Sequence, residues 1–252
     1  MKITFLGTGT SCGVPEIGCH CPVCTSTDPR DKRLRSSALI ETQGERILID
    51  CGPDFRQQML PLPFAPISGI LLTHEHYDHM GGIDDLRPFC RFGPVTIWSE
   101  AYVNAAIRQR IPYCFAEHKY PGIPQINLKE VQAFQPLHIG KAEVLPLRVI
   151  HGKLPILGFR IEQMAYLTDC LTVPAETKAE LRNIDTLIVS ALRDKPHPTH
   201  QTLSEALALI EELQPRRAYL IHPSHEIGLH AAVQAKLPAN VQLAYDGLEI
   251  EV

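Results

Sequence analysis

Four side chains that can bind a metal ion stand within the six residues 74–79, directly after an apolar run. They are His74, His76, Asp78 and His79. Residues two apart on an extended chain point to the same side, so His74 and His76 can converge on one ion while Asp78 and His79 turn towards a second. Imidazole and carboxylate ligands suit a borderline divalent ion that keeps an open position for water or substrate. The motif therefore predicts half of a two-metal hydrolytic site.

The other half is expected from residues that end strands elsewhere in the chain. Asp50 and Thr73 each end an apolar run of strand length. Three later apolar runs of the same kind lead into His151, Asp169 and His222. Because this pattern of a strand followed by a potential ligand is repeated, we expect these side chains to meet near one edge of a sheet.

A second group of potential metal ligands lies near the N-terminus. Cys19, Cys21 and Cys24 place three thiols within six residues, in a chain that shows no signal peptide and no transmembrane run. Cytosolic thiols stay reduced, so such a group indicates a metal site more than a disulfide. His20 lies between two ligating positions, which makes His225 the better fourth ligand. A Cys₃His zinc would then tie a loop at about residues 12–36 to the loop that carries His222, although three incidental cysteines remain the alternative.

The intervening segments predict helices and hairpins. Thr202 and Glu205 have the spacing of a capping box, and apolar residues then recur at helical spacing up to Leu213. Weaker helical patterns cover residues 101–109, 174–182 and 229–237, and hairpin turns are expected at 41–45 and 160–165. Paired strands followed by strands that alternate with helices indicate an α/β sandwich. The cysteines without a pattern are expected to be small core residues; they are Cys51, Cys90, Cys114 and Cys170.

The motif at 74–79, followed in order by a His, an Asp and a His at strand ends, resembles the metallo-β-lactamase superfamily over essentially the whole chain. The resemblance implies a four-layer αββα sandwich. It also implies that one metal ion is held by His74, His76 and His151, and that the other is held by Asp78, His79 and His222. Asp169 is implied to bridge the two ions.

Further motifs narrow the resemblance. The segments Leu6-Gly7-Thr8-Gly9-Thr10 and Gly13-Val14-Pro15, together with the three clustered cysteines, the motif at 74–79, His200 and the pair His222 and His225, are similar to the PhnP family of the carbon–phosphorus lyase pathway. That resemblance implies a cyclic phosphodiesterase acting on a phosphorylated ribose cyclic phosphate and on 2′,3′-cyclic nucleotides. It implies two divalent ions, manganese or zinc, in the active site, and it places the proton donor at His200.

The reaction expected from such a site is phosphodiester hydrolysis by a hydroxide that bridges the two metal ions. Asp78 and His200 are the predicted catalytic residues, and His200 would protonate the departing ribose oxygen. An exposed loop histidine is the other interpretation of His200. Lys153 and Arg193 are candidates for holding a second phosphate of the substrate.

Two other functions use the same motifs. A hydrolase of esters, thioesters or lactones would need an apolar acyl pocket and little help for the leaving group. A non-hydrolytic protein, similar to the pyrroloquinoline quinone accessory family, would use the metal ions for biosynthetic redox chemistry or for partner binding. Activity on a panel of esters and phosphodiesters would separate these possibilities.

Composition limits the partners. With 252 residues, 44% of them hydrophobic, the chain can bury the core of one domain, which we expect to span residues 1–252. Its net charge is −4, and the densest basic cluster, at residues 30–35, is predicted to be a solvated loop, so a polynucleotide is not the expected partner. We expect a small phosphodiester substrate, no membrane and a cytoplasmic location. The oligomeric state is open, with a homodimer as one form.

Overall fold

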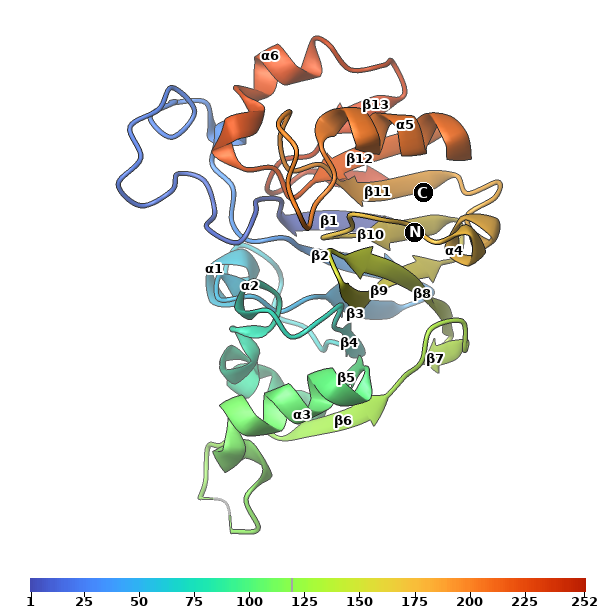
Figure 1. Cartoon of the computed structure of the whole chain (residues 1–252). Coiled ribbons are helices and arrows are strands. Elements are labelled where there is room, and N and C mark those ends of the chain that lie inside the picture. The colour runs from blue at the N-terminus through green and yellow to red at the C-terminus, as the bar shows by residue number, and fades with distance from the viewer. Residues whose placement is uncertain (119) are drawn as a thin grey trace.

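The computed structural model describes residues 1–118 and 120–252. The strands of these residues form two seven-stranded sheets, which lie against each other (Figure 1). The first sheet has the spatial order β14 (Glu249–Glu251), β1 (Lys2–Gly7), β2 (Ser37–Thr42), β3 (Glu45–Ile49), β4 (Gly69–Leu71), β5 (Val95–Ser99) and β6 (Ile126–Glu130). The second has the order β13 (Val241–Leu243), β12 (Arg217–Ile221), β11 (Thr186–Ser190), β10 (Met164–Leu167), β9 (Leu154–Ile161), β8 (Ala142–His151) and β7 (Leu137–Ile139).

Helices cover the outer face of each sheet. The α-helices are α1 (Phe55–Met59), α2 (Tyr77–Met80), α3 (Ala101–Arg110), α4 (Ala175–Glu180), α5 (Leu203–Leu213) and α6 (His230–Gln234). Short 3₁₀ segments are η1 (Pro29–Asp31), η2 (Ile83–Phe92), η3 (Pro112–Phe115) and η4 (His225–Ile227). None of the described helices is long and apolar enough to cross a membrane.

Three apolar layers hold the elements together. One lies between the sheets and includes Phe5 of β1 and Phe159 of β9. Another packs the second sheet against α5, through residues such as Leu209, and against α6. The third packs the first sheet against α1, η2 and α3. Helix, sheet, sheet and helix layers therefore follow one another, and the predicted four-layer αββα sandwich is confirmed.

The local predictions agree closely with the structure. Helix α5 begins with the expected capping box, in which the Thr202 hydroxyl accepts from the Glu205 amide at 3.2 Å and the Glu205 carboxylate accepts from the Thr202 amide at 2.8 Å. The segments predicted as helices at 101–109, 174–182 and 229–237 contain α3, α4 and α6. Both predicted hairpins are present, as the antiparallel pairs β2–β3 and β9–β10.

The prediction about the basic cluster is wrong. The basic cluster at 30–35 is not a solvated loop throughout, because Arg33 is 5% exposed and donates to Thr8 Oγ1 at 2.8 Å and to Ala244 O at 2.6 Å. Burial lowers the pKa of the Arg33 guanidinium to about 10, against the opposing effect of nearby carboxylates. The prediction about the cysteines agrees with the structure: Cys51, Cys114 and Cys170 are fully buried, and Cys90 is partly buried and packs against the core.

Parallel strands explain why the predicted ligands meet. Strands β3, β4, β5 and β6 run parallel in the first sheet, and β10, β11, β12 and β13 run parallel in the second. The carboxyl ends of parallel strands share one edge of a sheet, and side chains that follow these strands are therefore close in space. In Figure 1 the helices α1 and α2 and the loop that follows β1 lie together on the left side of the molecule.

Candidate active site

The first predicted ligand set, His74, His76 and His151, is brought together by β4 and β8. Its ligand atoms all lie within 4.8 Å of one another, and His74 Nε2 is 3.0 Å from His76 Nδ1. His74 and His151 are buried, whereas His76 is exposed. His151 Nδ1 donates to the carbonyl oxygen of Thr199 at 2.9 Å, which leaves Nε2 of this ring for the site.

The second set contains Asp78, His79, Asp169 and His222, whose ligand atoms also lie within 4.8 Å of one another. Asp78 and His79 come from α2, and the other two follow β10 and β12. His79 Nε2 is 3.1 Å from Asp78 Oδ2, and Asp169 Oδ1 is 3.4 Å from His79 Nε2 and 3.3 Å from His222 Nε2. The family resemblance implied the same four residues as the ligands of the second ion and the carboxylate that bridges the two ions.

Strained backbone presents several of these side chains. Asp50, Asp169 and His222 follow their strands with φ of 60°, 54° and 62°, in the left-handed region that residues other than glycine rarely adopt. Each such residue costs on the order of 1–3 kcal/mol, and strain of this kind gathers at functional sites. The chain turns sharply where each strand ends, so that these side chains enter the space between the loops.

Unpaired nitrogen atoms indicate that the second set fits a cation. Among the residues that the structure describes, buried ring nitrogens without a hydrogen-bond partner are His79 Nε2, His200 Nδ1 and both nitrogens of His222. Buried polar atoms nearly always have partners, and a divalent ion would supply one for the rings of His79 and His222. Burial lowers the pKa of His79, but the carboxylates of Asp169, Asp78 and Asp50 outweigh it and raise that pKa well above its ordinary value. The site therefore attracts positive charge, as a site for divalent cations must.

Asp50 has a contact that the sequence did not reveal. It is fully buried, and its Oδ2 accepts from His79 Nδ1 at 2.7 Å. Its Oδ1 accepts from the Thr73 amide at 2.9 Å, and the Thr73 hydroxyl is in turn 2.9 Å from His74 Nδ1. Asp50 therefore orients one ring in each ligand set. Its place at the end of a strand was the signal, but the partner ring could be identified only in three dimensions.

We expect Asp50→Asn to weaken metal binding by about 10–100-fold, because the residue behind a histidine ligand fixes the ring tautomer and its orientation. An amide nitrogen in place of Oδ2 cannot accept from His79 Nδ1. Metal titration followed by calorimetry measures the loss. Asp185→Asn, which changes a carboxylate that pairs with Arg216 near the surface, is the matched control and should bind metal normally. Unchanged affinity in Asp50→Asn would show that His79 does not depend on this contact.

Hydrogen bonds also fix the backbone of His222. Its backbone amide donates to the Thr8 carbonyl at 2.7 Å, and Thr8 donates through its own amide and hydroxyl to Asp246 Oδ1, at 2.9 and 2.7 Å. The buried Arg33 donates to the same Thr8 hydroxyl. The loop after β1, which matched the family's glycine-containing motif, thus fixes a predicted ligand that is more than two hundred positions further along the chain.

His200 lies where the predicted acid should stand. It is 9% exposed, and its ring lies 4.6 Å from that of His151 and 5.0 Å from that of His222, measured between centroids. It forms a third group within 4.8 Å together with His151 and Asp169, so Asp169 is common to two groups. Burial, reinforced by His222, lowers the pKa of His200 to about 3. The alternative of an exposed loop histidine is excluded, while its role as an acid remains a prediction.

The two candidates for a second phosphate differ in their surroundings. Arg193 forms a close ion pair with Glu226 and donates to the Lys195 carbonyl, so much of its binding capacity is already used. Lys153 is exposed in the turn between β8 and β9, two residues after His151. Between these two, only Lys153 presents an exposed cation next to a predicted ligand.

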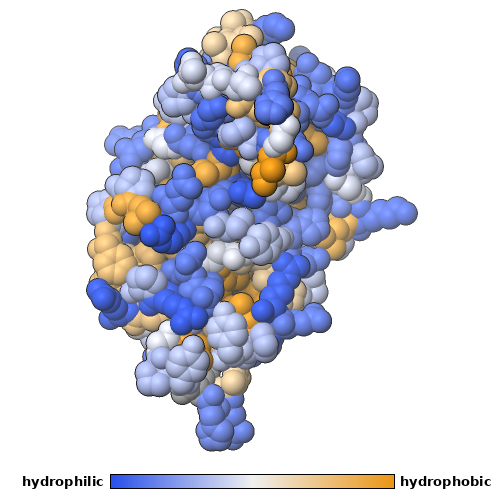
Figure 2. Space-filling view, turned by 90° about the vertical axis from the view of Figure 1, so that its left-hand side faces the viewer, coloured by the Kyte–Doolittle hydropathy of each residue, from blue (hydrophilic) through white to orange (hydrophobic). Residues whose placement is uncertain are grey.

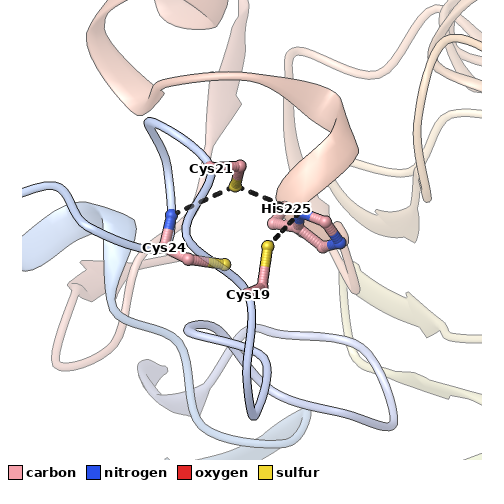
Figure 3. A group of neighbouring side chains, drawn as sticks. All are labelled: Cys19, Cys21, Cys24 and His225. Carbon is pink, nitrogen blue, oxygen red and sulfur yellow. Dashed lines mark hydrogen bonds between the residues drawn. The ribbon is translucent and has the colours of Figure 1, made fainter.

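The predicted zinc ligands also come together. Figure 3 shows Cys19, Cys21 and Cys24 of the loop after β1 facing His225 of η4, and their ligand atoms lie within 4.8 Å of one another. His225 Nδ1 is 3.2 Å from Cys21 Sγ and 3.6 Å from Cys19 Sγ, while His225 Nε2 is 3.1 Å from Glu16 Oε2. The backbone amide of Cys24 lowers the pKa of the Cys21 thiol to about 6, which favours the thiolate that zinc requires. His20 does not belong to this group.

Cys24→Ala is expected to lower both the melting temperature and the occupancy of the second ligand set, because His225 is three residues from His222 and would lose its anchor. Differential scanning calorimetry and elemental analysis measure the two effects. Cys12→Ala alters an exposed cysteine of the same loop outside the group and serves as the control. If Cys24→Ala melts like the wild type and keeps its tightly bound zinc, the cysteine site does not brace the active site.

Comparison with known proteins agrees with this geometry. A family model described as a beta-lactamase superfamily domain matches residues 45–223. A solved structure of a new diphosphatase from the PhnP family is 38% identical, with a TM-score of 0.92 over 99% of this chain and 96% of that one. Zinc-bound PqqB from Methylobacterium extorquens has a TM-score of 0.82 over the full length of both chains, but at 20% identity the likeness shows the fold alone.

One similar curated protein is longer than this chain. An octanoyltransferase of Porphyromonas gingivalis is 46% identical over 251 residues, which cover 99% of this chain and 51% of that protein. The chain thus spans about half the length of this relative.

Proposed function

The chain belongs to the beta-lactamase superfamily and, within it, to the PhnP family, and from this premise we propose that it is a two-metal phosphodiesterase of small cyclic phosphodiesters. Its fold and relatives support a metal-dependent hydrolase. The proposal adds the substrate class, namely ribose cyclic phosphates and 2′,3′-cyclic nucleotides, and the metal ions: manganese or zinc in the active site and one zinc at the cysteine site.

One observation carries the proposal: a buried histidine, His200, is grouped with His151 of the first ligand set and with Asp169 of the second. A hydrolase of activated esters has little use for a proton donor, because its leaving group departs unaided. A ribose oxygen is a poor leaving group and gains about 10²–10⁴-fold from a positioned acid. The arrangement therefore favours a substrate with an alkoxide leaving group, and the likeness to a PhnP-family diphosphatase favours a phosphorus-containing substrate among these.

The residues divide the work as follows. His74, His76 and His151 would hold one ion, Asp78, His79 and His222 the other, and Asp169 would touch both. When bound, the two ions activate a water molecule and neutralise the phosphate oxygens. His200 lies outside both ligand sets, so its ring would be available to bond a substrate oxygen. An anionic phosphodiester beside the ring favours its charged form, so His200 would gain its proton together with the substrate.

A second candidate is the cleavage of a diphosphate bond, because the PhnP-family relative is described as a diphosphatase. It uses the same ligands, but a phosphate leaving group needs less help from His200. Octanoyl transfer is not proposed, since that name belongs to a protein of which this chain spans 51%. The pyrroloquinoline quinone alternative has support from the fold shared with PqqB and from 28% sequence identity to the coenzyme PQQ synthesis protein B of Methylorubrum populi.

A substrate panel tests the proposal. Purified protein with added Mn²⁺ is assayed on 2′,3′-cyclic AMP, bis(p-nitrophenyl) phosphate, ADP-ribose, p-nitrophenyl octanoate and a precursor tRNA. We expect the highest kcat/KM on the cyclic nucleotide, with a phosphomonoester as product. Preference for ADP-ribose would select the second candidate. Preference for the octanoate ester, tRNA cleavage without activity on cyclic nucleotides, or inactivity on all five with full metal content would each overturn the proposal.

A further inference from the structure

The predicted metal site opens to solvent on one side. Six of the seven residues in the two ligand sets are buried, with exposures of 9% or less. The seventh, His76, is exposed. His76 is therefore the ligand that solvent reaches, and the exposed residues beside it are the first to consider for contact with the rest of a substrate.

Tyr77 is the next residue along the chain and is 62% exposed. It begins helix α2 and stands between His76 of the first ligand set and Asp78 of the second. Consecutive Cα atoms are about 3.8 Å apart, so the tyrosine backbone lies next to one ligand from each set. A single exposed aromatic ring on a protein surface needs no explanation by itself, but Tyr77 is flanked along the chain by a predicted ligand of each set.

The ring of Tyr77 has a defined support. A Cβ atom added to Gly81 would lie 2.7 Å from Tyr77 Cε2 and 2.8 Å from Tyr77 Cζ. The ring is therefore packed on the bare backbone of Gly81, one helical turn later, and an alanine there would collide with it. A ring that is backed by the protein on one side and exposed on the other is a preformed flat surface.

The surroundings suit a small planar ligand. Figure 2 shows the side of the molecule that carries α1, α2 and the loop after β1, and most of its residues are hydrophilic, with hydrophobic residues in small patches. A broad apolar docking face is therefore not seen on this side. Tyrosine adds a rigid aromatic surface at low conformational cost, and every nucleobase has a face that can stack on it.

We propose that Tyr77 is the stacking platform for the nucleobase of a 2′,3′-cyclic nucleotide whose phosphate lies at the two metal sets. The inference rests on the proposed phosphodiesterase function and names the part of the substrate that the metal ligands do not touch. It makes Tyr77 a specificity residue, one that favours nucleotides over cyclic phosphates without a base. No sequence preference among bases is required, because stacking does not read hydrogen-bonding edges.

The test compares two substrates that differ only in the base: 2′,3′-cyclic AMP and methyl riboside 2′,3′-cyclic phosphate. For each we measure kcat and KM in the wild type, Tyr77→Ala, Tyr77→Phe and Tyr77→Leu. Tyr77→Ala should lower the ratio of the two kcat/KM values by about 5- to 150-fold, which corresponds to about 1–3 kcal/mol of base stacking. The change should appear in KM for cyclic AMP. Tyr77→Phe keeps the ring and should keep the ratio, whereas Tyr77→Leu should lose most of it.

Tyr120→Ala is the matched control. Tyr120 is 68% exposed and lies in the segment between η3 and β6, at the lower end of the molecule in Figure 1, so this variant should leave both substrates unaffected. If the wild type hydrolyses both substrates and Tyr77→Ala leaves their ratio unchanged, the stacking inference is wrong and the phosphodiesterase stands. If the wild type hydrolyses neither substrate, the proposed function itself fails. If the ratio of the two kcat/KM values falls as much in Tyr77→Phe as in Tyr77→Ala, the effect belongs to the tyrosine hydroxyl and the stacking inference is wrong.

Discussion

Asp169→Ala is expected to abolish phosphodiester hydrolysis and to lower metal occupancy at both ligand sets. Asp169 is 2% exposed and lies within 3.4 Å of both His79 Nε2 and His222 Nε2 of the second set. It is also grouped with His151 of the first set. Without this carboxylate, two neighbouring cations would lose the negative charge between them. The loss of metal affinity and activity should exceed the roughly 10–100-fold that follows from removing a residue that hydrogen-bonds to a metal ligand. Elemental analysis and kcat/KM on one preparation measure it.

The comparison with Asp78→Ala makes this test specific. Asp78 belongs to one set alone, so its variant should keep more metal than Asp169→Ala. Asp185→Ala, which removes a carboxylate that pairs with Arg216, should keep full metal content and activity. Asp169→Ala with near-normal turnover, or with less metal loss than Asp78→Ala, would remove the bridging role.

His200→Ala should slow hydrolysis most for substrates whose leaving group must be protonated to depart. On 2′,3′-cyclic AMP, whose ribose oxygen leaves poorly, we expect about a 10²–10⁴-fold loss of kcat. On bis(p-nitrophenyl) phosphate, whose nitrophenolate leaves unaided, most of the rate should remain. Metal content should not change. The two rates and the metal stoichiometry are measured on the same sample.

His197→Ala provides the control from the same loop, since its ring lies 5.1 Å from that of His200 and it belongs to none of the metal-binding groups. Both rates should stay within a few-fold of the wild type there. Equal losses on the two substrates in His200→Ala, or a fall in metal content, would identify His200 as a ligand instead of an acid. The close approach of His200 to His151 and Asp169 makes that outcome a real alternative.

The ligand sets could be predicted because each ligand follows a strand or lies in one short motif. His151, Asp169 and His222 are far apart in sequence, but they follow strands that run in the same direction. Strands β10, β11 and β12 are parallel, and β8 has the direction of β10 because both pair antiparallel with β9. Each of these strands is an apolar run followed by a polar residue, which is why the sequence pattern could predict the arrangement. The capping box at Thr202 is a similarly local signal, because its partners are three residues apart.

The hydrogen bonds that orient the predicted metal ligands could not be predicted from the sequence. Asp50 meets a histidine 29 positions later, and Asp246 reaches Thr8 across 238 positions, with no periodic pattern to connect them. The error at Arg33 has the same origin: a basic cluster usually faces solvent, but here the chain folds one of its members against Thr8 and Ala244. The exposure of His76 and Tyr77 also depends on which loops surround the site, and the arrangement of these loops could not be predicted from the sequence.

Metal titration tests the central claim most directly. Protein is stripped of exchangeable metal by mild chelation, its tightly bound zinc is confirmed by elemental analysis, and hydrolysis of 2′,3′-cyclic AMP is followed while Mn²⁺ is added and its binding is measured. Thiolate-rich zinc sites hold metal more tightly than His and carboxylate sites, so the two populations can be separated. We predict that turnover appears as the second exchangeable ion binds. Full turnover with one exchangeable ion, or none with two bound, would contradict a two-metal phosphodiesterase.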